Sequence, residues 1–427
     1  MASSTELESR LLEAITGIQA IDVHSHVPFD APVAASLREL LGYHYFTELA
    51  HSAGVSKEAV APEAADEAML SAMVQALPTL DNTVQHGWLM EIARELFGFT
   101  GGSLTRENWE VLADSVRKEA AEPGRERKVL SASGIEKVFL TNAFDDDLSE
   151  VDREIFVPCL RADALVFRFA EADVRKRLEK VTGSNVGSAE ALTAALEKLL
   201  ERFVRSGAAS VAISLPPDLR AYPVVPGDLE TAVGKAAGGK PLSAAEGQTL
   251  RCGTLFALCD TCRNFKLPLQ VMFGAVRAAY RHGVPQGTDL PQAGESLRAL
   301  MPLFNSFPEV TFCVSALSDS QAQELASYGW IVRNVVVSGH WWYDGLPAYI
   351  ERDLTARLQS VPKTKLIGYY SDMYKLEFGL PKFNMYRRVL ARVLARDYVE
   401  GGRGSEPQAV EIARLLLRSN ARRIFGV

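Results

Sequence analysis

The 427-residue sequence lacks the features that mark membrane, disulfide-rich and secreted proteins. It has no run of the ~18 consecutive apolar residues that span a bilayer, and residues 1–20 lack the basic and apolar segments of a signal peptide. Its five cysteines are an odd number in a long chain, which favours a reducing compartment over a disulfide framework. We therefore expect a cytoplasmic protein with no membrane partner.

Excess positive charge is also absent. Lys and Arg total 46 against 53 Asp and Glu, the net charge is −7, and no dense basic run could follow a phosphate backbone. Nucleic acid is therefore not expected as a partner. Hydrophobic residues (47%) and charged residues (23%) are at the levels of an ordinary globular protein, so the length predicts one large domain with an elaboration, or two domains.

Short apolar or β-branched runs bounded by turn residues predict eight strands. They lie at residues 18–26, 137–143, 164–169, 209–214, 269–274, 310–316, 333–339 and 365–371. Helical patterns fill the gaps, and this alternation indicates parallel strands joined by helical crossovers. Eight such strands close naturally into a (β/α)8 TIM barrel, which is the α/β fold we expect. An open, doubly wound sheet is the alternative.

The connection after the first predicted strand is far longer than an ordinary loop and contains helical periodicity. We predict three parts of the chain. Residues 1–29 form an N-terminal helix and the first barrel strand, residues 30–135 form a helical insertion over the mouth of the barrel, and residues 136–427 complete the barrel.

Two of the seven histidines stand one residue apart, in the segment IDVHSH. On a strand, His24 and His26 project to the same side, because side chains alternate between the two faces. At the carboxyl end of a first barrel strand they would lie where barrel active sites lie, and neutral imidazole is a common ligand of divalent metal ions. A chance HxH on a surface turn is the alternative, which the eight-strand context disfavours.

A site with two histidines needs an anionic ligand, and the last predicted strand ends at Asp372 in GYYSDMY. Its carboxylate would lie beside the first strand, where the barrel closes. Capping of the next helix is an equally good explanation for Asp372 taken alone. With His24 and His26, it predicts one divalent metal ion, with zinc as the default.

An HxH after the first strand and an aspartate after the last resemble the amidohydrolase superfamily of metal-dependent barrels. Within it, the sequence resembles the uronate isomerases, which interconvert aldose and ketose forms of hexuronates such as glucuronate and galacturonate. The motifs are collinear with that family and comprise GYHYFTEL (42–49), PCLRADALV (158–166), LQVMFGAVR (269–277), SGHWWYD (338–344) and the ending RSNARRIFG.

The resemblance implies roles for individual residues. It implies a catalytic base at Asp372, an active-site tyrosine at Tyr45, two arginines that bind the substrate carboxylate, and two tryptophans in the pocket. The arginines are Arg161 and Arg277, and the tryptophans are Trp341 and Trp342. A guanidinium forms the forked hydrogen bonds that suit a carboxylate, although a surface ion pair is the alternative for either arginine.

The sequence departs from the family pattern at three places. Met272 stands where the family has a histidine, Tyr374 replaces an arginine after Asp372, and the fourth strand lacks an Asp-His pair. These changes make the pocket less polar, and a phenol at Tyr374 offers a neutral donor to an oxyanion where the family has a fixed charge. We therefore expect weak or absent turnover of glucuronate and galacturonate, and a true substrate that is either a modified sugar acid or one with an apolar group near Met272.

The sequence thus predicts a metal-dependent aldose–ketose isomerase for a hexuronate or related small-molecule sugar acid, and we expect a homo-oligomer. Two alternatives stay open: a metal-dependent hydrolase or decarboxylase acting on a small carboxylate, and an inactive ligand-binding barrel. His340 and His44 are candidates for a third imidazole at the mouth, whereas Glu377 is expected to be a solvated helix carboxylate. The CxxC of Cys259 and Cys262 has no second ligand pair, so it predicts buried thiols.

Overall fold

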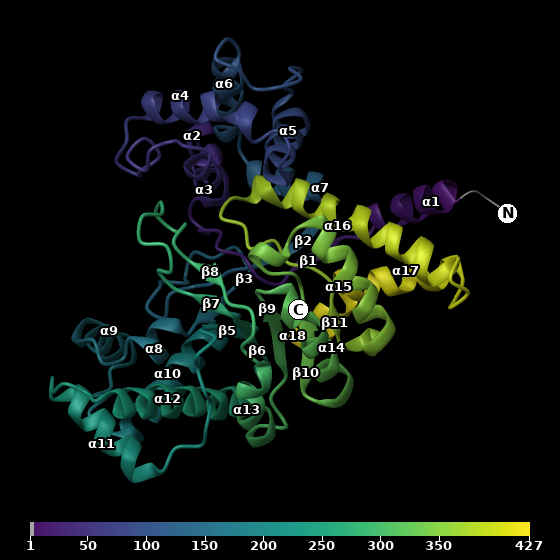
Figure 1. The fold of residues 1–427 in the computed structure, drawn as a ribbon. Coiled ribbons are helices and arrows are strands. Elements are labelled where there is room, and N and C mark those ends of the chain that lie inside the picture. The colour runs from purple at the N-terminus through teal and green to yellow at the C-terminus, as the bar shows by residue number, and fades with distance from the viewer. Residues whose placement is uncertain (1–3) are drawn as a thin grey trace.

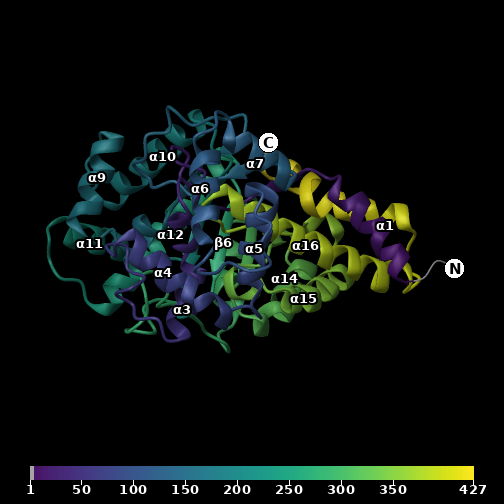
Figure 2. The same ribbon diagram turned by 90° about the horizontal axis from the view of Figure 1, so that it is seen from above.

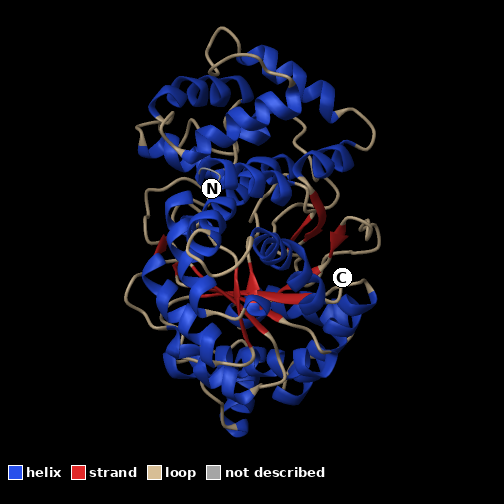
Figure 3. Ribbon diagram, turned by 90° about the vertical axis from the view of Figure 1, so that its right-hand side faces the viewer, coloured by secondary structure: helices blue, strands red, loops and turns tan. Residues whose placement is uncertain are grey.

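The computed structural model describes residues 4–427 and has parallel strands at its centre with helices around them (Figures 1 and 3). The barrel strands are β1 (Ala20–Asp22), β2 (Ile135–Phe139), β3 (Phe156–Val157), β4 (Cys159–Arg161), β5 (Ser210–Leu215), β6 (Leu269–Phe273), β9 (Phe312–Ala316), β10 (Val335–Ser338) and β11 (Leu366–Ile367). One parallel sheet joins β1, β2 and β3, and a second joins β4, β5, β6, β9, β10 and β11 in that order.

Pro158 divides one barrel strand into β3 and β4. Because proline has no backbone N–H to donate, it interrupts the ladder; β3 pairs with β2 before it, and β4 pairs with β5 after it. A bridge between Asn142 and Leu160 joins the two sheets. Counted in this way, the strands occupy eight positions in chain order, and the predicted TIM-barrel fold is confirmed.

Among the described residues, no regular ladder joins β11 to β1, so strand pairing does not close the barrel there. Two backbone hydrogen bonds at the carboxyl end bridge the gap: Asp372 N donates to His24 O at 3.1 Å, and His26 N donates to Met373 O at 2.8 Å. Further back along β11, Gly368 N instead donates to Leu416 O of a helical turn at 2.9 Å. The seam of the barrel is therefore tied at the predicted metal ligands.

The third strand lies earlier in the chain than the sequence predicted. Residues 164–169 were expected to be a strand, but Asp163–Phe167 form the helix α8, and β3 and β4 precede it. A short apolar run does not distinguish a strand from a buried helical turn by periodicity, and Leu165 and Val166 are buried from the helix instead. The shift places Arg161 at the carboxyl end of β4.

Helices cover the outside of the barrel because each carries one apolar face. In α10 (Ala189–Arg205), buried leucines and Phe203 recur at helical spacing, and the Ser188 side chain caps the first turn. The other long helices of this layer are α1 (Ser4–Thr16), α9 (Ala172–Thr182), α11 (Pro226–Ala237), α12 (Ala244–Phe265), α14 (Ala322–Ile331), α15 (Pro347–Ser360), α16 (Gly379–Val393) and α17 (Glu406–Arg414). Over residues 4–427, no helix is long and apolar enough to cross a membrane.

The connection between β1 and β2 contains α2 (Leu37–Leu41), α3 (His44–Ser52), α4 (Asp66–Ala76), α5 (Val84–Phe97), α6 (Trp109–Ala120) and α7 (Arg125–Ser133). Figures 1 and 2 show α3 to α6 gathered on one side of the barrel. In Figure 1, α3 is the one nearest to the strands β7 (Ala275–Val276) and β8 (Leu290–Pro291). The helical character expected for residues 30–135 is therefore present, and the proposed three-part division of the chain stays a prediction.

The five cysteines are free and buried, and the burial predicted for Cys259 and Cys262 is confirmed. Three of them, Cys252, Cys259 and Cys262, lie on α12. Burial raises the pKa of the Cys262 thiol well above its usual range, which keeps it protonated and inert.

Candidate metal and substrate site

The structure brings His24, His26 and Asp372 together at the mouth of the barrel. Asp372 Oδ1 lies 3.5 Å from His24 Nε2 and 3.3 Å from His26 Nε2. The three side chains could share one metal ion, because their ligand atoms all lie within 4.8 Å of one another. They line a pocket of about 260 Å³. The predicted metal ligands thus converge from the two ends of the sequence.

Local backbone geometry aims the two histidines in the same direction. They follow β1 in an extended segment, and between them the Ser25 hydroxyl turns away to donate to Phe139 O at 2.7 Å. Asp372 has a φ of 53°, in the left-handed region that aspartate adopts only with local support. Ser371 supplies part of that support, since its N–H donates to the buried carboxylate of Asp22 at 2.9 Å.

Thr141, a residue that the sequence interpretation missed, orients His26. The Thr141 hydroxyl lies 2.8 Å from Ser25 O, to which it donates, and 2.7 Å from His26 Nδ1, from which it can only accept. The proton of His26 therefore sits on Nδ1, and the lone pair of Nε2 faces Asp372. In the sequence, only the position of Thr141 just after β2 could have indicated that it contributes to the site.

The donor set fits a divalent cation. Burial and the neighbouring His26 lower the pKa of His24 to about 3, so His24 is neutral near pH 7. Burial alone would raise the pKa of Asp372, but the adjacent imidazoles of His26 and His24 and the ammonium of Lys382 lower it to about 2. The buried Oδ1 of Asp372 has no hydrogen-bond donor within the described chain. The lone pair of the His26 imidazole and the carboxylate oxygen of Asp372 repel each other, and a cation bound between them would remove that repulsion.

The predicted arginines both line the pocket. Arg161 has a side chain 45% exposed, and its Nε lies 3.4 Å from Asp163. Arg277 follows β7, with a side chain 49% exposed, and donates to Asp289 at 2.6 Å and to Ser214 Oγ at 2.8 Å. Each guanidinium is therefore paired at one edge and half-exposed, as a binding group facing an open pocket should be.

Four further predicted residues line the same pocket: Met272, Trp341, Trp342 and Tyr374. The ring of Tyr374 lies 4.9 Å from the ring of His26, so the residue at the position of the family arginine stands beside a predicted metal ligand. Met272 is buried at 3% exposure on β6. The pocket wall is accordingly less polar on these two sides, as the sequence indicated.

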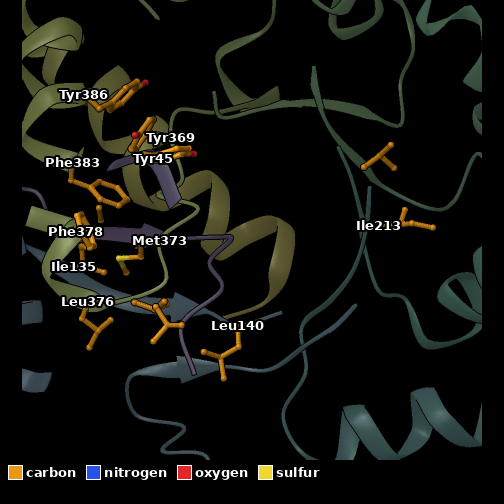
Figure 4. Packing of buried hydrophobic residues seen from close by; sticks show 14 of the residues in the cluster. Tyr45, Ile135, Leu140, Ile213, Tyr369, Met373, Leu376, Phe378, Phe383 and Tyr386 are labelled. Atoms are coloured by element: carbon orange, nitrogen blue, oxygen red, sulfur yellow. The ribbon is translucent and has the colours of Figure 1, made fainter. Parts of the chain in front are cut away.

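Tyr45 lies outside this pocket. It is buried among the apolar side chains shown in Figure 4, and its ring lies 4.8 Å from that of Tyr43. Its neighbour His44 does line the pocket, and His44 Nδ1 lies 2.7 Å from Glu48 Oε1. Both residues begin α3, and the rotation of that helix places the imidazole rather than the phenol in the pocket of the predicted metal ligands.

His340 and Glu377 have surroundings different from those expected. His340 does not line the pocket; its Nδ1 lies 3.3 Å from Asp344 Oδ2 and 3.4 Å from Asp353 Oδ2 in a buried cluster. Glu377 was expected to be solvated but is only 1% exposed. It accepts from Ala34 N at 3.2 Å, so the first turn after Asp372 packs inward instead of facing solvent.

The whole chain is similar to known proteins. The family model described as glucuronate isomerase matches residues 8–425. A uronate isomerase from Rhizorhabdus wittichii is 24% identical over 92% of this chain and 89% of its own length. Two solved structures have the same fold: a uronate isomerase from Thermotoga maritima (TM-score 0.90, 19% identity, 98% of this chain and 97% of that one) and a glucuronate isomerase from Caulobacter crescentus (TM-score 0.89, 18% identity, 99% and 94%).

Proposed function

Since the chain belongs to the glucuronate isomerase family, we propose that it is a metal-dependent aldose–ketose isomerase of a hexuronate or related sugar acid. One observation carries the proposal. A single pocket of about 260 Å³ holds the metal-ligand set on one wall and the guanidinium groups of Arg161 and Arg277 on another. A small molecule with a carboxylate at one end and a carbonyl at the other suits such a pocket.

Aldose–ketose isomerisation removes a proton from the carbon beside a carbonyl and returns it to the neighbouring carbon. A base and a group that stabilises negative charge on oxygen are both needed. A divalent ion held by His24, His26 and Asp372, which we propose to be zinc, would supply positive charge beside the substrate oxygens. We propose the ionised carboxylate of Asp372 as the base.

The remaining polar groups of the pocket have positions that suit proton transfer and orientation. His44, whose Nδ1 is paired with Glu48, can hold or release a proton at its other nitrogen. The Tyr374 hydroxyl can donate to a developing oxyanion, and burial raises its pKa well above the usual range, so it stays protonated. We assign this donor role to Tyr374, because Tyr45 lies outside the pocket.

Arg161 and Arg277 would bind the carboxylate. Each guanidinium has spare donors beyond its present aspartate partner. Binding at this end would place the carbonyl end of an open-chain sugar acid against the metal-ligand wall, so that the reacting carbons and the base lie together. We further propose that the enzyme is cytoplasmic and homo-oligomeric, which fractionation and analytical ultracentrifugation would check.

The test is a panel of hexuronates incubated in deuterated water with metal-loaded protein. NMR should show formation of the ketose with deuterium at C1, and of recovered aldose with deuterium at C2. The matched control is the His24→Ala/His26→Ala variant, which should form none. Hydrolysis or decarboxylation of the panel without aldose–ketose exchange would replace this proposal with a hydrolase or decarboxylase.

The substitutions at Met272 and Tyr374 define a second test. A neutral phenol beside His26 provides less charge stabilisation than an arginine, so we expect slow turnover of unmodified glucuronate and galacturonate. The Met272→His/Tyr374→Arg variant should raise it. A wild-type kcat on the order of 10–100 s⁻¹, ordinary for an enzyme, would show that neither substitution limits the reaction.

A further inference from the structure

A second, larger cavity adjoins the metal pocket, and we propose that it binds a neutral, apolar-faced substituent carried on O4 of the sugar acid. The preferred substrate would then be an O4-substituted uronate instead of the free sugar acid. The inference rests on the proposed function, because the sugar-acid end must occupy the metal pocket for its substituent to reach this cavity.

The second cavity has a volume of about 940 Å³. It lies between α3, the start of α5, the loop that joins β7 to β8, and the segment that follows β10. Asp289 and Trp342 line both cavities, so the two spaces meet at these residues. The metal pocket, at about 260 Å³, is near the small end of the usual ~300–1,000 Å³ for small-molecule sites, and the second cavity is near the large end.

The wall of the second cavity suits a flat or apolar-faced group. Trp342 and Tyr343 stack with ring centroids 4.8 Å apart and planes inclined by 12°. Tyr280 and Leu290 expose 47% and 48% of their surface, large values for residues of these types. Aromatic rings stack on other rings and on the apolar faces of sugars. Such a wall gains free energy when a ligand covers it.

The backbone and indole of Trp342 add a second, independent indication of ligand binding at the junction. Trp342 has a φ of 48°, in the left-handed region that a bulky side chain rarely adopts. Strained conformations of this kind concentrate at functional sites. Its indole Nε1 is also buried without an acceptor among residues 4–427, although a buried indole N–H normally finds a partner.

Charge decides between a neutral and an acidic substituent. Glu48 and Asp289 both line the cavity, and each already pairs with a group on the metal-pocket side, His44 and Arg277 respectively. Within the described part of the chain, no lysine or arginine lines the cavity. His51 also lines the cavity, but both of its ring nitrogens already face backbone carbonyls, at 2.9 Å from Val55 O and 3.2 Å from His282 O. A second carboxylate would therefore lose water without gaining a free cationic partner, which argues against an oligouronide.

The position of the substituent follows from the chemistry. Isomerisation engages C1 and C2, and the arginines engage the carboxylate, so only the oxygens on C3, C4 and C5 are free. Arg277 and Asp289 stand at the junction of the cavities, so an oxygen near the carboxylate end is the one that faces outward. O4 meets this condition and leaves O5 free for the ring form of the sugar.

The experiment compares four reducing uronates with metal-loaded wild-type enzyme: galacturonate, 4-O-benzyl-galacturonate, a galacturonate with a neutral glucosyl group on O4, and digalacturonate. We expect kcat/KM for the benzyl or the glucosyl compound to exceed that for galacturonate by about tenfold or more, a gain of about 1.4 kcal/mol. Digalacturonate should show no gain. The two neutral probes distinguish an aromatic substituent from a sugar.

A space-filling variant separates the cavity from the metal pocket. Val84 lines the second cavity and does not line the metal pocket. Val84→Trp should lower kcat/KM for the favoured substituted compound by about tenfold and leave that for galacturonate unchanged. Val111→Trp, at a position 62% exposed on α6 and outside both cavities, is the matched control and should change neither value.

The outcomes for this inference and for the proposed function differ. Turnover of galacturonate with no gain from either neutral substituent, or an equal gain from digalacturonate, would overturn the inference and leave the isomerase proposal standing. If no compound is isomerised, calorimetric binding decides: tighter binding of a neutral substituted compound, weakened by Val84→Trp, would support the cavity and refute the isomerase. The absence of any binding would refute both.

Discussion

Replacing Lys382 with methionine should destabilise the fold and loosen the predicted metal site together. Lys382 lies on α16 and is only 2% exposed. Its ammonium donates to Ser371 O at 2.7 Å and to the Tyr43 hydroxyl at 2.9 Å, and Tyr43 in turn donates to Asp372 O at 3.0 Å. The buried ammonium thus fixes the carbonyl group of Ser371 directly and that of Asp372 through Tyr43, and these two residues form the turn that carries the Asp372 side chain.

The expected loss of stability follows from these contacts. Two hydrogen bonds from a charged donor contribute about 1.5–3 kcal/mol each. The ammonium also lies 4.8–5.2 Å from the ring centroids of Tyr43, Tyr45 and Trp88, which adds about 2 kcal/mol at a desolvated site. Desolvation of the ammonium opposes these gains by several kcal/mol, and methionine retains most of the packing. We expect a net loss of about 2–4 kcal/mol.

The measurement is denaturant unfolding of chelator-treated protein, so that metal binding does not contribute to the midpoint. Lys363→Met is the matched control, because Lys363 is 49% exposed and pairs with Glu411 on the surface; we expect a loss below about 1 kcal/mol. A metal titration should also show about 10–100-fold weaker binding in Lys382→Met, as for other supports of metal ligands. The reasoning is refuted if Lys382→Met changes neither the midpoint beyond the control nor the metal affinity.

Three further predictions concern the metal, the substrate carboxylate and pH. His24→Ala/His26→Ala should abolish tight binding of a divalent ion, and a full equivalent of metal in the purified variant would contradict the ligand assignment. Arg277→Ala should weaken sugar-acid binding by about 1–3 kcal/mol, measured by calorimetry, because the guanidinium is half-exposed; unchanged affinity would remove it from the binding site. Burial raises the pKa of Glu377 to about 7, so the folded protein keeps a proton there that the unfolded chain loses, and wild type should lose stability as pH rises from about 4.5 to 7. Glu377→Gln should lack that loss, so its free energy of unfolding should rise relative to that of wild type by about 3 kcal/mol across this window. Unfolding titrations in which the free energies of the two proteins change in parallel with pH would disprove this prediction.

The sequence alone predicted the position of a site residue wherever the pattern that determines this position lies within one short segment or in the order of the strands. The strand alternation of IDVHSH placed His24 and His26 on one side, and the collinear spacing of strands placed Asp372 beside them. Both inferences depend on a period of two and on chain order, which are properties of the backbone alone. Arg161 and Arg277 also line this pocket, but their assignment depended on the resemblance of their motifs, because the strand that ends at Arg161 was predicted in the wrong place.

Tertiary structure decided the features that depend on how one element is rotated against another. The adjacent residues His44 and Tyr45 lie in one motif, and only the docking of α3 on the barrel turns the imidazole, rather than the phenol, into the metal pocket. Glu377 has the pattern of a solvated carboxylate, yet its turn is buried. Lys382 lies ten residues beyond Asp372 in the sequence, and its contacts to Ser371 and Tyr43 exist only once α16 and α3 have packed together. Burial, and the partners it brings, are determined by three-dimensional packing, which a pattern along one element does not specify.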